Sequence, residues 1–290
     1  MAAPDLEPVQ FEAPGGGPVL HGESQGPGRD IFLCHGLSAT RRYVVHGSKV
    51  LPRNGYRLHT YDARGHGESD PAAEYTYQLL ADDLETVVTD RGAADDLILG
   101  GHSMGCHTAV TFALRHPERV AALILAGPVY TGEDDDLDLG RWDERAEALE
   151  REGPAGFARV VGEHVDAADD IRETIVRLAQ GRAELHRHPE AVADALRQVP
   201  RSKPFETIDE LETLGMPVLV VASHDEMDDS HPYAVAERYA ATLPDATMIS
   251  EEPGESPLSW QGGRLSREIA GFLGKHGLGP GPGGPAAAAG

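Results

Sequence analysis

The pentapeptide from Gly101 to Gly105 reads Gly-His-Ser-Met-Gly and directly follows the apolar run Leu97–Leu99. A strand that runs into G-x-S-x-G and continues as a helix must turn so tightly that the residues two before and two after the serine need almost no side chain. This turn, the nucleophile elbow, holds the serine hydroxyl out above the sheet. Ser103 is therefore the strongest candidate for a reactive atom in the chain.

Two further motifs follow predicted strands. His35-Gly36-Leu37 comes after the apolar run Ile31–Cys34, and Asp62-Ala63-Arg64-Gly65-His66-Gly67-Glu68-Ser69 comes after the run Arg57–Tyr61. The second matches the pattern D-x-R-G-H-G-x-S. Together with the elbow, these motifs make the chain resemble the α/β-hydrolase superfamily over residues 9–276.

The resemblance implies an oxyanion hole, formed by two backbone amides that stabilise a developing negative charge. In such enzymes the loop after the first of these strands supplies one amide, here that of Leu37, and the residue after the nucleophile supplies the other, here that of Met104. It also implies that His35, Asp62 and the other charged residues of these loops shape the turns rather than react.

The acid of the implied Ser–acid–His triad follows the elbow in the sequence. The strand Val218–Ala222 leads into Ser223-His224-Asp225, and Asp225 stands three residues past Ala222, where related hydrolases with a G-x-x-D turn carry their acid. Asp228 and Asp229 are close enough in sequence to be rivals. We therefore expect Asp225 to be the acid.

The chain departs from the family at the histidine. The place before the last helix, which commonly reads Gly-His, here reads Gly254-Glu255, and no histidine occurs between His231 and His276. A glutamate is a poorer base than an imidazole because its reference pKa is about 4.3. Burial beside Asp225 would raise that pKa, since two adjacent carboxylates resist ionising together.

Three hypotheses follow. In the first, Glu255 takes the place of the histidine in a Ser103–Asp225–Glu255 site that hydrolyses an ester, lactone, thioester or amide. In the second, His231 supplies the base. In the third, the scaffold is a lyase, an isomerase or a ligand-binding protein without hydrolase activity. No cofactor and no metal are expected, because the histidines and cysteines lack ligand spacing and no nucleotide-binding loop occurs.

The elements that must position these residues alternate between apolar β-rich runs and helical patterns. This predicts an α/β fold with a mostly parallel sheet. The resemblance implies that it is the α/β-hydrolase fold, with about eight strands and helices on both faces. The predicted strands are Val9–Ala13, Val19–Glu23, Ile31–Cys34, Arg57–Tyr61, Leu97–Gly100, Ala121–Leu125, Val218–Ala222 and Thr247–Ser250, the first two as an antiparallel pair. The predicted helices are Tyr43–Leu51, Tyr77–Thr89, Met104–Arg115, Tyr233–Leu243 and Arg264–Gly274.

The alternation stops in the middle of the chain, where Ala, Glu, Arg and Leu dominate and strand signals are absent. We therefore expect a hydrolase core in two parts, residues 1–129 and 213–276, with a helical cap at 130–212 between them. Residues 277–290 are almost entirely Gly, Pro and Ala, which predicts a disordered tail.

Composition narrows the function further. With 48 acidic and 25 basic residues the formal net charge is −23, a field that repels phosphate backbones, so a nucleic-acid partner is not expected. No apolar run is long enough to span a membrane, and the first twenty residues do not resemble a signal peptide. Two cysteines give no disulfide framework. These features predict a cytoplasmic protein whose partner is a small-molecule substrate; the oligomeric state is left open.

Overall fold

The computed structural model describes residues 6–12, 16–132, 139–225 and 230–280. Its centre is an eight-stranded sheet of order β1-β2-β4-β3-β5-β6-β7-β8. β1 and β2 pair antiparallel, β2 also runs antiparallel to β4, and the remaining neighbours are parallel. The predicted fold class, a mostly parallel α/β-hydrolase sheet, is confirmed.

Each predicted strand is present, with ends that differ by a few residues. The strands are β1 (Leu6–Glu12), β2 (Val19–Gln25), β3 (Arg29–Cys34), β4 (Tyr56–Tyr61), β5 (Leu97–His102), β6 (Val120–Ala126), β7 (Val218–Val221) and β8 (Ala246–Ile249). The strands β6 and β7 are apolar throughout because both faces of a parallel sheet are covered. On β3, Phe32 and Cys34 belong to one core layer and Ile31 and Leu33 to the other.

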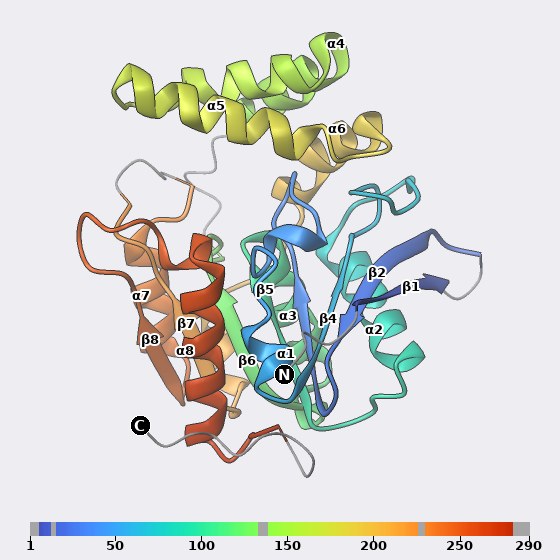
Figure 1. The fold of residues 1–290 in the computed structure, drawn as a ribbon, viewed down its shortest axis with the longest axis vertical. Helices are drawn as coiled ribbons and strands as arrows, with labels where there is room; N and C mark the ends of the chain where they lie inside the picture. Colours follow the sequence, from blue (N-terminus) through green and yellow to red (C-terminus); the bar gives the residue numbers. More distant parts are fainter. Residues whose placement is uncertain (1–5, 13–15, 133–138, 226–229, 281–290) are drawn as a thin grey trace.

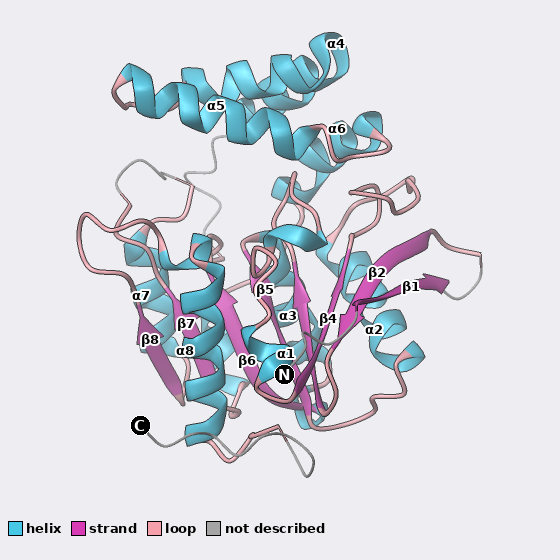
Figure 2. Cartoon of the chain, in the orientation of Figure 1, coloured by secondary structure: helices cyan, strands magenta, loops and turns pink. Residues whose placement is uncertain are grey.

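Helices cover both faces of the sheet (Figures 1 and 2). The layer that contains Phe32 packs against α2 (Tyr77–Asp90), α3 (Met104–Arg115) and α7 (Tyr233–Thr242). The layer that contains Ile31 packs against α1 (Val50–Arg53) and α8 (Gly262–Lys275). Four of the five predicted helices therefore form close to where the sequence pattern put them.

The predicted helix Tyr43–Leu51 is wrong. The structure has a single 3₁₀ turn at Arg41–Tyr43 and then the short α1, which begins at Val50. Between them His46 and Gly47 both adopt positive φ, 48° and 70°, and a right-handed helix cannot continue through such residues.

Residues 139–201 form a helical layer beyond the sheet, at the end where β5 and β6 finish (Figure 1). The layer contains α4 (Leu139–Glu163), α5 (Asp169–Ala183) and α6 (Pro189–Gln198), followed by a 3₁₀ turn at Val199–Arg201. Its own core includes Leu149, Phe157 and Leu196. The division into core and cap at residues 130 and 212 stays a prediction, and residues 133–138 lie outside the described part.

The start of the predicted disordered tail is ordered, which corrects the prediction for residues 277–280. Leu278 packs against the α8 side of the core, and its carbonyl accepts a hydrogen bond from the Tyr56 hydroxyl at 3.3 Å. The Arg29 amide donates to the carbonyl of Pro280 at 3.2 Å. An apolar leucine among the glycines and prolines is enough to dock this segment. Residues 281–290 lie outside the described part.

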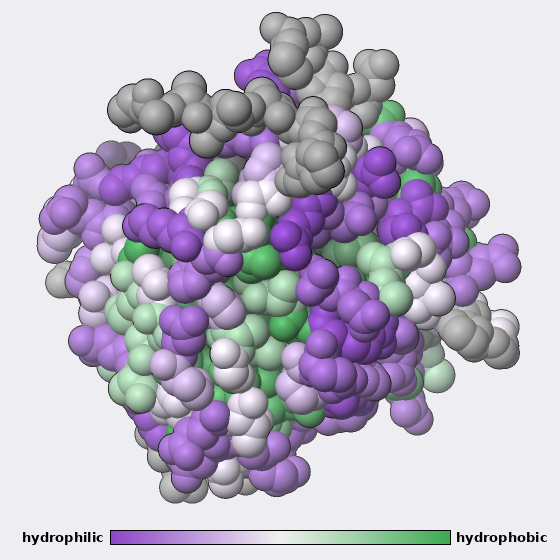
Figure 3. All heavy atoms as spheres, turned by 90° about the horizontal axis from the view of Figure 1, so that it is seen from below, coloured by the Kyte–Doolittle hydropathy of each residue, from purple (hydrophilic) through white to green (hydrophobic). Residues whose placement is uncertain are grey.

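The face opposite the helical layer is apolar in its middle and hydrophilic around its rim (Figure 3). Nothing in the described chain forms a helix long and apolar enough to cross a membrane.

Candidate active site

Ser103 lies at a sharp turn between strand and helix. β5 ends at His102, α3 begins at Met104, and Ser103 between them has φ 52° and ψ −113°. A non-glycine residue in this region costs about 1–3 kcal/mol, so the surrounding contacts must impose the conformation. One of them is the hydrogen bond from the Ser103 amide to the carbonyl of Ala126 at 2.9 Å. The side chain is partly exposed.

The two glycines of the motif are required by close packing. A Cβ atom on Gly101 or on Gly105 would overlap the carbonyl oxygen of Cys34 at the end of β3. The one on Gly101 would also meet the backbone of Gly105, 2.7 Å from its carbonyl carbon. With no side chains at these two positions, α3 rests directly on the neighbouring strand β3.

The loop after β3 lies against this turn. A Cβ on Gly36 would be 3.5 Å from Cβ of Ser103, and Ser38 adopts φ 58°. His35 holds the loop: its Nε2 accepts from the Ala63 amide at 2.9 Å, so its Nδ1 carries the proton and donates to the Gly36 carbonyl at 2.8 Å. Burial lowers the pKa of His35, which keeps the ring neutral.

Leu37 and Met104, the predicted oxyanion donors, flank the elbow. Met104 is the first residue of α3, where a backbone N–H has no partner within the helix and the helix dipole favours negative charge. Both side chains pack in one cluster with Ala191 and Ala195 of α6, and Leu37 also contacts the core of the helical layer. The predicted donors therefore lie where the core meets the helical layer.

The D-x-R-G-H-G-x-S turn is built around Asp62, which is fully buried. Its carboxylate accepts from the amides of Arg41 at 2.8 Å and Glu68 at 3.0 Å and pairs with the Arg41 guanidinium. A Cβ on Gly67 would collide with the same carboxylate. These contacts agree with the structural role predicted for Asp62.

Arg64 of the same turn anchors it to α2. Its guanidinium makes two hydrogen bonds of 2.7 Å to the buried carboxylate of Asp83. Burial raises the pKa of Asp83 and the hydrogen bonds from Arg64 oppose that shift. Arg64 therefore serves the architecture of the turn.

The predicted acid loop begins after β7 and is tied to the loop after β8 by Glu251. This carboxylate, 2% exposed, accepts from the Ser223 hydroxyl at 2.8 Å and from the amides of His224 at 2.5 Å and Leu258 at 2.8 Å. Burial raises its pKa, but these hydrogen bonds outweigh burial, and the net pKa is lowered. Asp225 is partly buried, and its amide donates to the Ser223 hydroxyl at 3.1 Å. The rivals Asp228 and Asp229 lie outside the described residues.

Glu255 is placed differently from the expectation. Its side chain is 48% exposed and pairs with Arg264 of α8 at 2.6 Å. The hydrogen bond from Arg264 lowers the pKa of Glu255, the opposite of the rise expected from burial beside Asp225. That expectation was wrong because the carboxylate lies on the surface of the loop, where a guanidinium holds it in its ionised form. No contact described in the structure joins Glu255 to Ser103 or Asp225.

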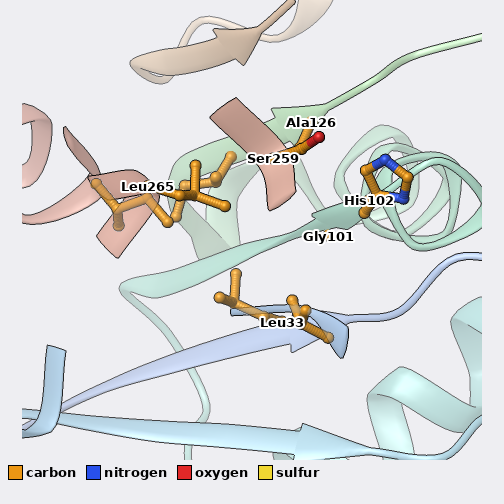
Figure 4. Close-up of a pocket in the computed structure, with 9 residues that line it drawn as sticks. Leu33, Gly101, His102, Ala126, Ser259 and Leu265 are labelled. Atoms are coloured by element: carbon orange, nitrogen blue, oxygen red, sulfur yellow. The ribbon is translucent and has the colours of Figure 1, made fainter. Parts of the chain in front are cut away.

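His231 lies near the elbow. Its ring centroid is 4.8 Å from that of His102, the residue before Ser103, and a Cβ on Gly127 would touch both rings. His102 also borders a small apolar recess with Leu33, Ala126, Ser259 and Leu265 (Figure 4). The structure therefore brings His231, the predicted alternative base, close to His102.

Sequence reasoning missed two buried residues that organise this region, Glu251 and His186. His186 stands between α5 and α6, and its ring bonds the Gly67 amide and the Ser38 carbonyl. These partners lie 119 and 148 residues away, so no local pattern signals the contacts. Across the described residues no group of three or more His, Cys, Asp or Glu side chains is arranged to hold a metal ion.

Comparison with known proteins places this geometry in a family. The model of the alpha/beta hydrolase fold matches residues 31–262. The chain belongs to the α/β hydrolase fold family. A relative in Agrobacterium fabrum, named "Putative carbamate hydrolase RutD", is 28% identical over 232 residues, which cover 79% of this chain and 86% of that protein.

Solved structures agree. A thermophilic esterase from Thermogutta terrifontis has a TM-score of 0.76 at 26% identity, covering 93% of this chain and 99% of that one. The enol-lactonase from Burkholderia xenovorans has a TM-score of 0.72 at 22% identity, covering 91% and 99%, and at that identity supports the fold alone.

Proposed function

We propose that the protein is a serine hydrolase acting on a small carbonyl substrate: an ester, lactone, thioester or amide. The observation that carries the proposal is the strained turn at Ser103, packed against the Gly36 loop and opening the helix α3. An unfavourable backbone conformation persists only where the surrounding contacts impose it, and such positions cluster at active sites. The named activities of the carbamate hydrolase relative and of the esterase support the same class of reaction.

In this mechanism the Ser103 Oγ attacks the carbonyl carbon and gives its proton to a base. The amides of Leu37 and Met104 stabilise the oxyanion that forms. The base then protonates the leaving group as its bond to the acyl carbon breaks. A water molecule, deprotonated by the same base, releases the acyl group and restores Ser103. The substrate would lie between the core and the helical cap.

We assign the base to His231 and the orienting acid to Asp225. The position of His231 beside His102 supports this choice, as does the ability of an imidazole both to accept and to donate a proton. Glu255 is the weaker candidate because its carboxylate is ion-paired with Arg264 and its pKa is lowered.

Labelling with a fluorophosphonate and hydrolysis of p-nitrophenyl acetate test the nucleophile. We expect wild-type protein to react with both, and Ser103→Ala to lose labelling and at least about 100-fold in kcat. Ser256→Ala, which alters an exposed serine, is the control and should match the wild type. Absence of labelling in the wild type at any pH between about 6 and 9 would instead favour a binding protein, lyase or isomerase.

Two further variants test the base. His231→Gln should lower kcat by about 100-fold, the usual contribution of a general base. Glu255→Gln should stay within about twofold of the wild type. The reverse pattern would return the role of base to Glu255 and refute the assignment to His231.

A further inference from the structure

His186, in the helical layer, contacts the loop after β3 that carries Leu37, one of the predicted oxyanion donors. It is 8% exposed and lies in the turn between α5 and α6. Its Nδ1 accepts a hydrogen bond from the Gly67 amide at 2.8 Å, so in the neutral ring the proton is on Nε2, which donates to the Ser38 carbonyl at 3.2 Å. Burial lowers its pKa to about 4, so this tautomer is neutral at physiological pH.

Gly67, which donates to the His186 ring, is itself held in place by its neighbours. The Arg187 amide donates to the Gly67 carbonyl at 2.8 Å, so consecutive residues of the helical layer bind both polar groups of one glycine. A Cβ on Gly67 would collide with Oδ2 of Asp62, so this glycine packs closely against the Asp62 carboxylate. The imidazole is therefore held rigidly from the side of the Asp62 turn.

The contact with Ser38 continues to Leu37 through two peptide groups. A peptide group is planar, and in the trans form its C=O and N–H point in opposite directions. The Ser38 carbonyl shares a plane with the Ala39 amide, which donates to the Gly36 carbonyl at 3.1 Å. The Gly36 carbonyl, which also accepts from His35 Nδ1 at 2.8 Å, shares a plane with the Leu37 amide. The Ala39 amide and His35 therefore orient this second plane together, and the first of these contacts depends on the plane that His186 fixes.

We propose that His186 is a positioning residue that aims the Leu37 amide at the oxyanion through this chain of two peptide groups. The inference rests on the proposed function, because it assumes that this amide stabilises a transition state. It makes the helical layer part of the catalytic apparatus as well as a cover for it. Hydrogen bonds in series also polarise one another, which strengthens the last donor.

Two substitutions at His186 separate positioning from simple packing, because each removes one of its two hydrogen bonds. In His186→Asn the amide oxygen replaces Nδ1 as acceptor for Gly67, and the donor to Ser38 is lost. In His186→Gln the amide nitrogen replaces Nε2 as donor to Ser38, and the acceptor for Gly67 is lost. His188→Ala, at the neighbouring histidine that pairs with Glu190, is the control.

With p-nitrophenyl acetate we expect His186→Asn to lower kcat roughly tenfold with KM unchanged, less than the roughly 100-fold loss for a removed donor. His186→Gln and His188→Ala should stay within about threefold of the wild type. Equal loss of kcat in His186→Asn and His186→Gln would overturn the proposal, because it would mean that His186 acts only through packing.

Amide hydrogen exchange gives a second readout that does not require activity. His186→Asn should speed exchange in the peptide covering Gly36 to Ala39, whereas His186→Gln should not. Unchanged exchange in both variants would overturn the proposal. If the proposed function fails, the wild type is unreactive toward fluorophosphonate; faster exchange in His186→Asn would then support the structural link alone and overturn its catalytic part.

Discussion

Ser103 and Glu251 differ in how far their roles can be predicted from the sequence around them. The motif that indicates the turn at Ser103 could be recognised because Gly101 to Gly105 lie within five residues of sequence. The carbonyls of Cys34 and Ala126 that pack against the turn come from other strands. The role of Glu251 could not be predicted, because the amides that donate to its carboxylate belong to two loops that meet only in the folded chain. The same holds for Glu255, whose exposed position follows from its pairing with Arg264 rather than from the motif around it.

The lowered pKa of Glu251 predicts a pH dependence of stability. Because its folded pKa lies below the ordinary value of 4.5, the ionised form stabilises the fold; this contribution is complete above the unfolded pKa and is lost as pH falls through the folded pKa. Glu251→Gln should lower the free energy of unfolding by about 1–3 kcal/mol near pH 7, since the amide leaves one buried N–H without an acceptor.

The difference between Glu251→Gln and the wild type should shrink as the pH falls below 4.5 and on through the lowered folded pKa of Glu251. Urea titrations across this range measure it, with the exposed neighbour in Glu252→Gln as control. A difference that stays constant with pH would contradict the assigned pKa shift.

At the scale of elements, the strands were easier to predict than the helices. Apolar runs in a parallel sheet are marked in the sequence by their own composition, and each predicted run forms a strand. The predicted helix Tyr43–Leu51 failed because backbone conformations at His46 and Gly47, set by the packing of this loop, override its apolar pattern. Helical content in the middle of the chain was predicted, but its division into α4, α5 and α6 was not.

The bend in α4 offers a test at this scale. Gly153 has φ 70° and ψ −160°, a region almost restricted to glycine, and precedes Pro154. Gly153→Ala should therefore cost about 1–3 kcal/mol through backbone strain alone, because a Cβ there meets nothing within 4 Å.

Gly181 of α5 is the matched control. A Cβ there also meets nothing within 4 Å, but its backbone is helical, so Gly181→Ala should stabilise the protein by about 0.5–1 kcal/mol. Chemical denaturation of both variants measures whether each substitution raises or lowers the free energy of unfolding. Stabilisation by Gly153→Ala would show that the bend is not fixed by the backbone of that residue.

For the whole molecule, the net charge of −23 is the dominant electrostatic property. Acidic residues spread over a surface repel one another in the compact state more than in the unfolded chain. Buried acids such as Asp62 and Asp83 are compensated by arginines, so the repulsion arises at the surface. The repulsion between surface charges can be predicted from composition alone. The pairing of the buried acids with arginines can be seen only in the structure.

Salt should therefore stabilise the protein. Raising NaCl from about 10 mM to about 150 mM shortens the Debye length from about 30 Å to about 8 Å, and we expect the melting temperature to rise by about 2–4 °C. Differential scanning calorimetry measures the shift. The same experiment near the isoelectric point should give a smaller rise; an equal rise there would assign the effect to something other than charge repulsion.

The hydrogen bonds from the His186 ring and the Arg187 amide to Gly67 have a consequence for protein engineering. The helical layer stands between β6 and β7 in the sequence, so it could be exchanged as one segment for that of another α/β hydrolase to seek a new specificity. In this protein such a graft would also replace the partners of Ser38 and Gly67. A chimaera that retains the His186 side chain should keep its turnover, whereas one designed from pocket shape alone would acquire the new specificity at the expense of rate.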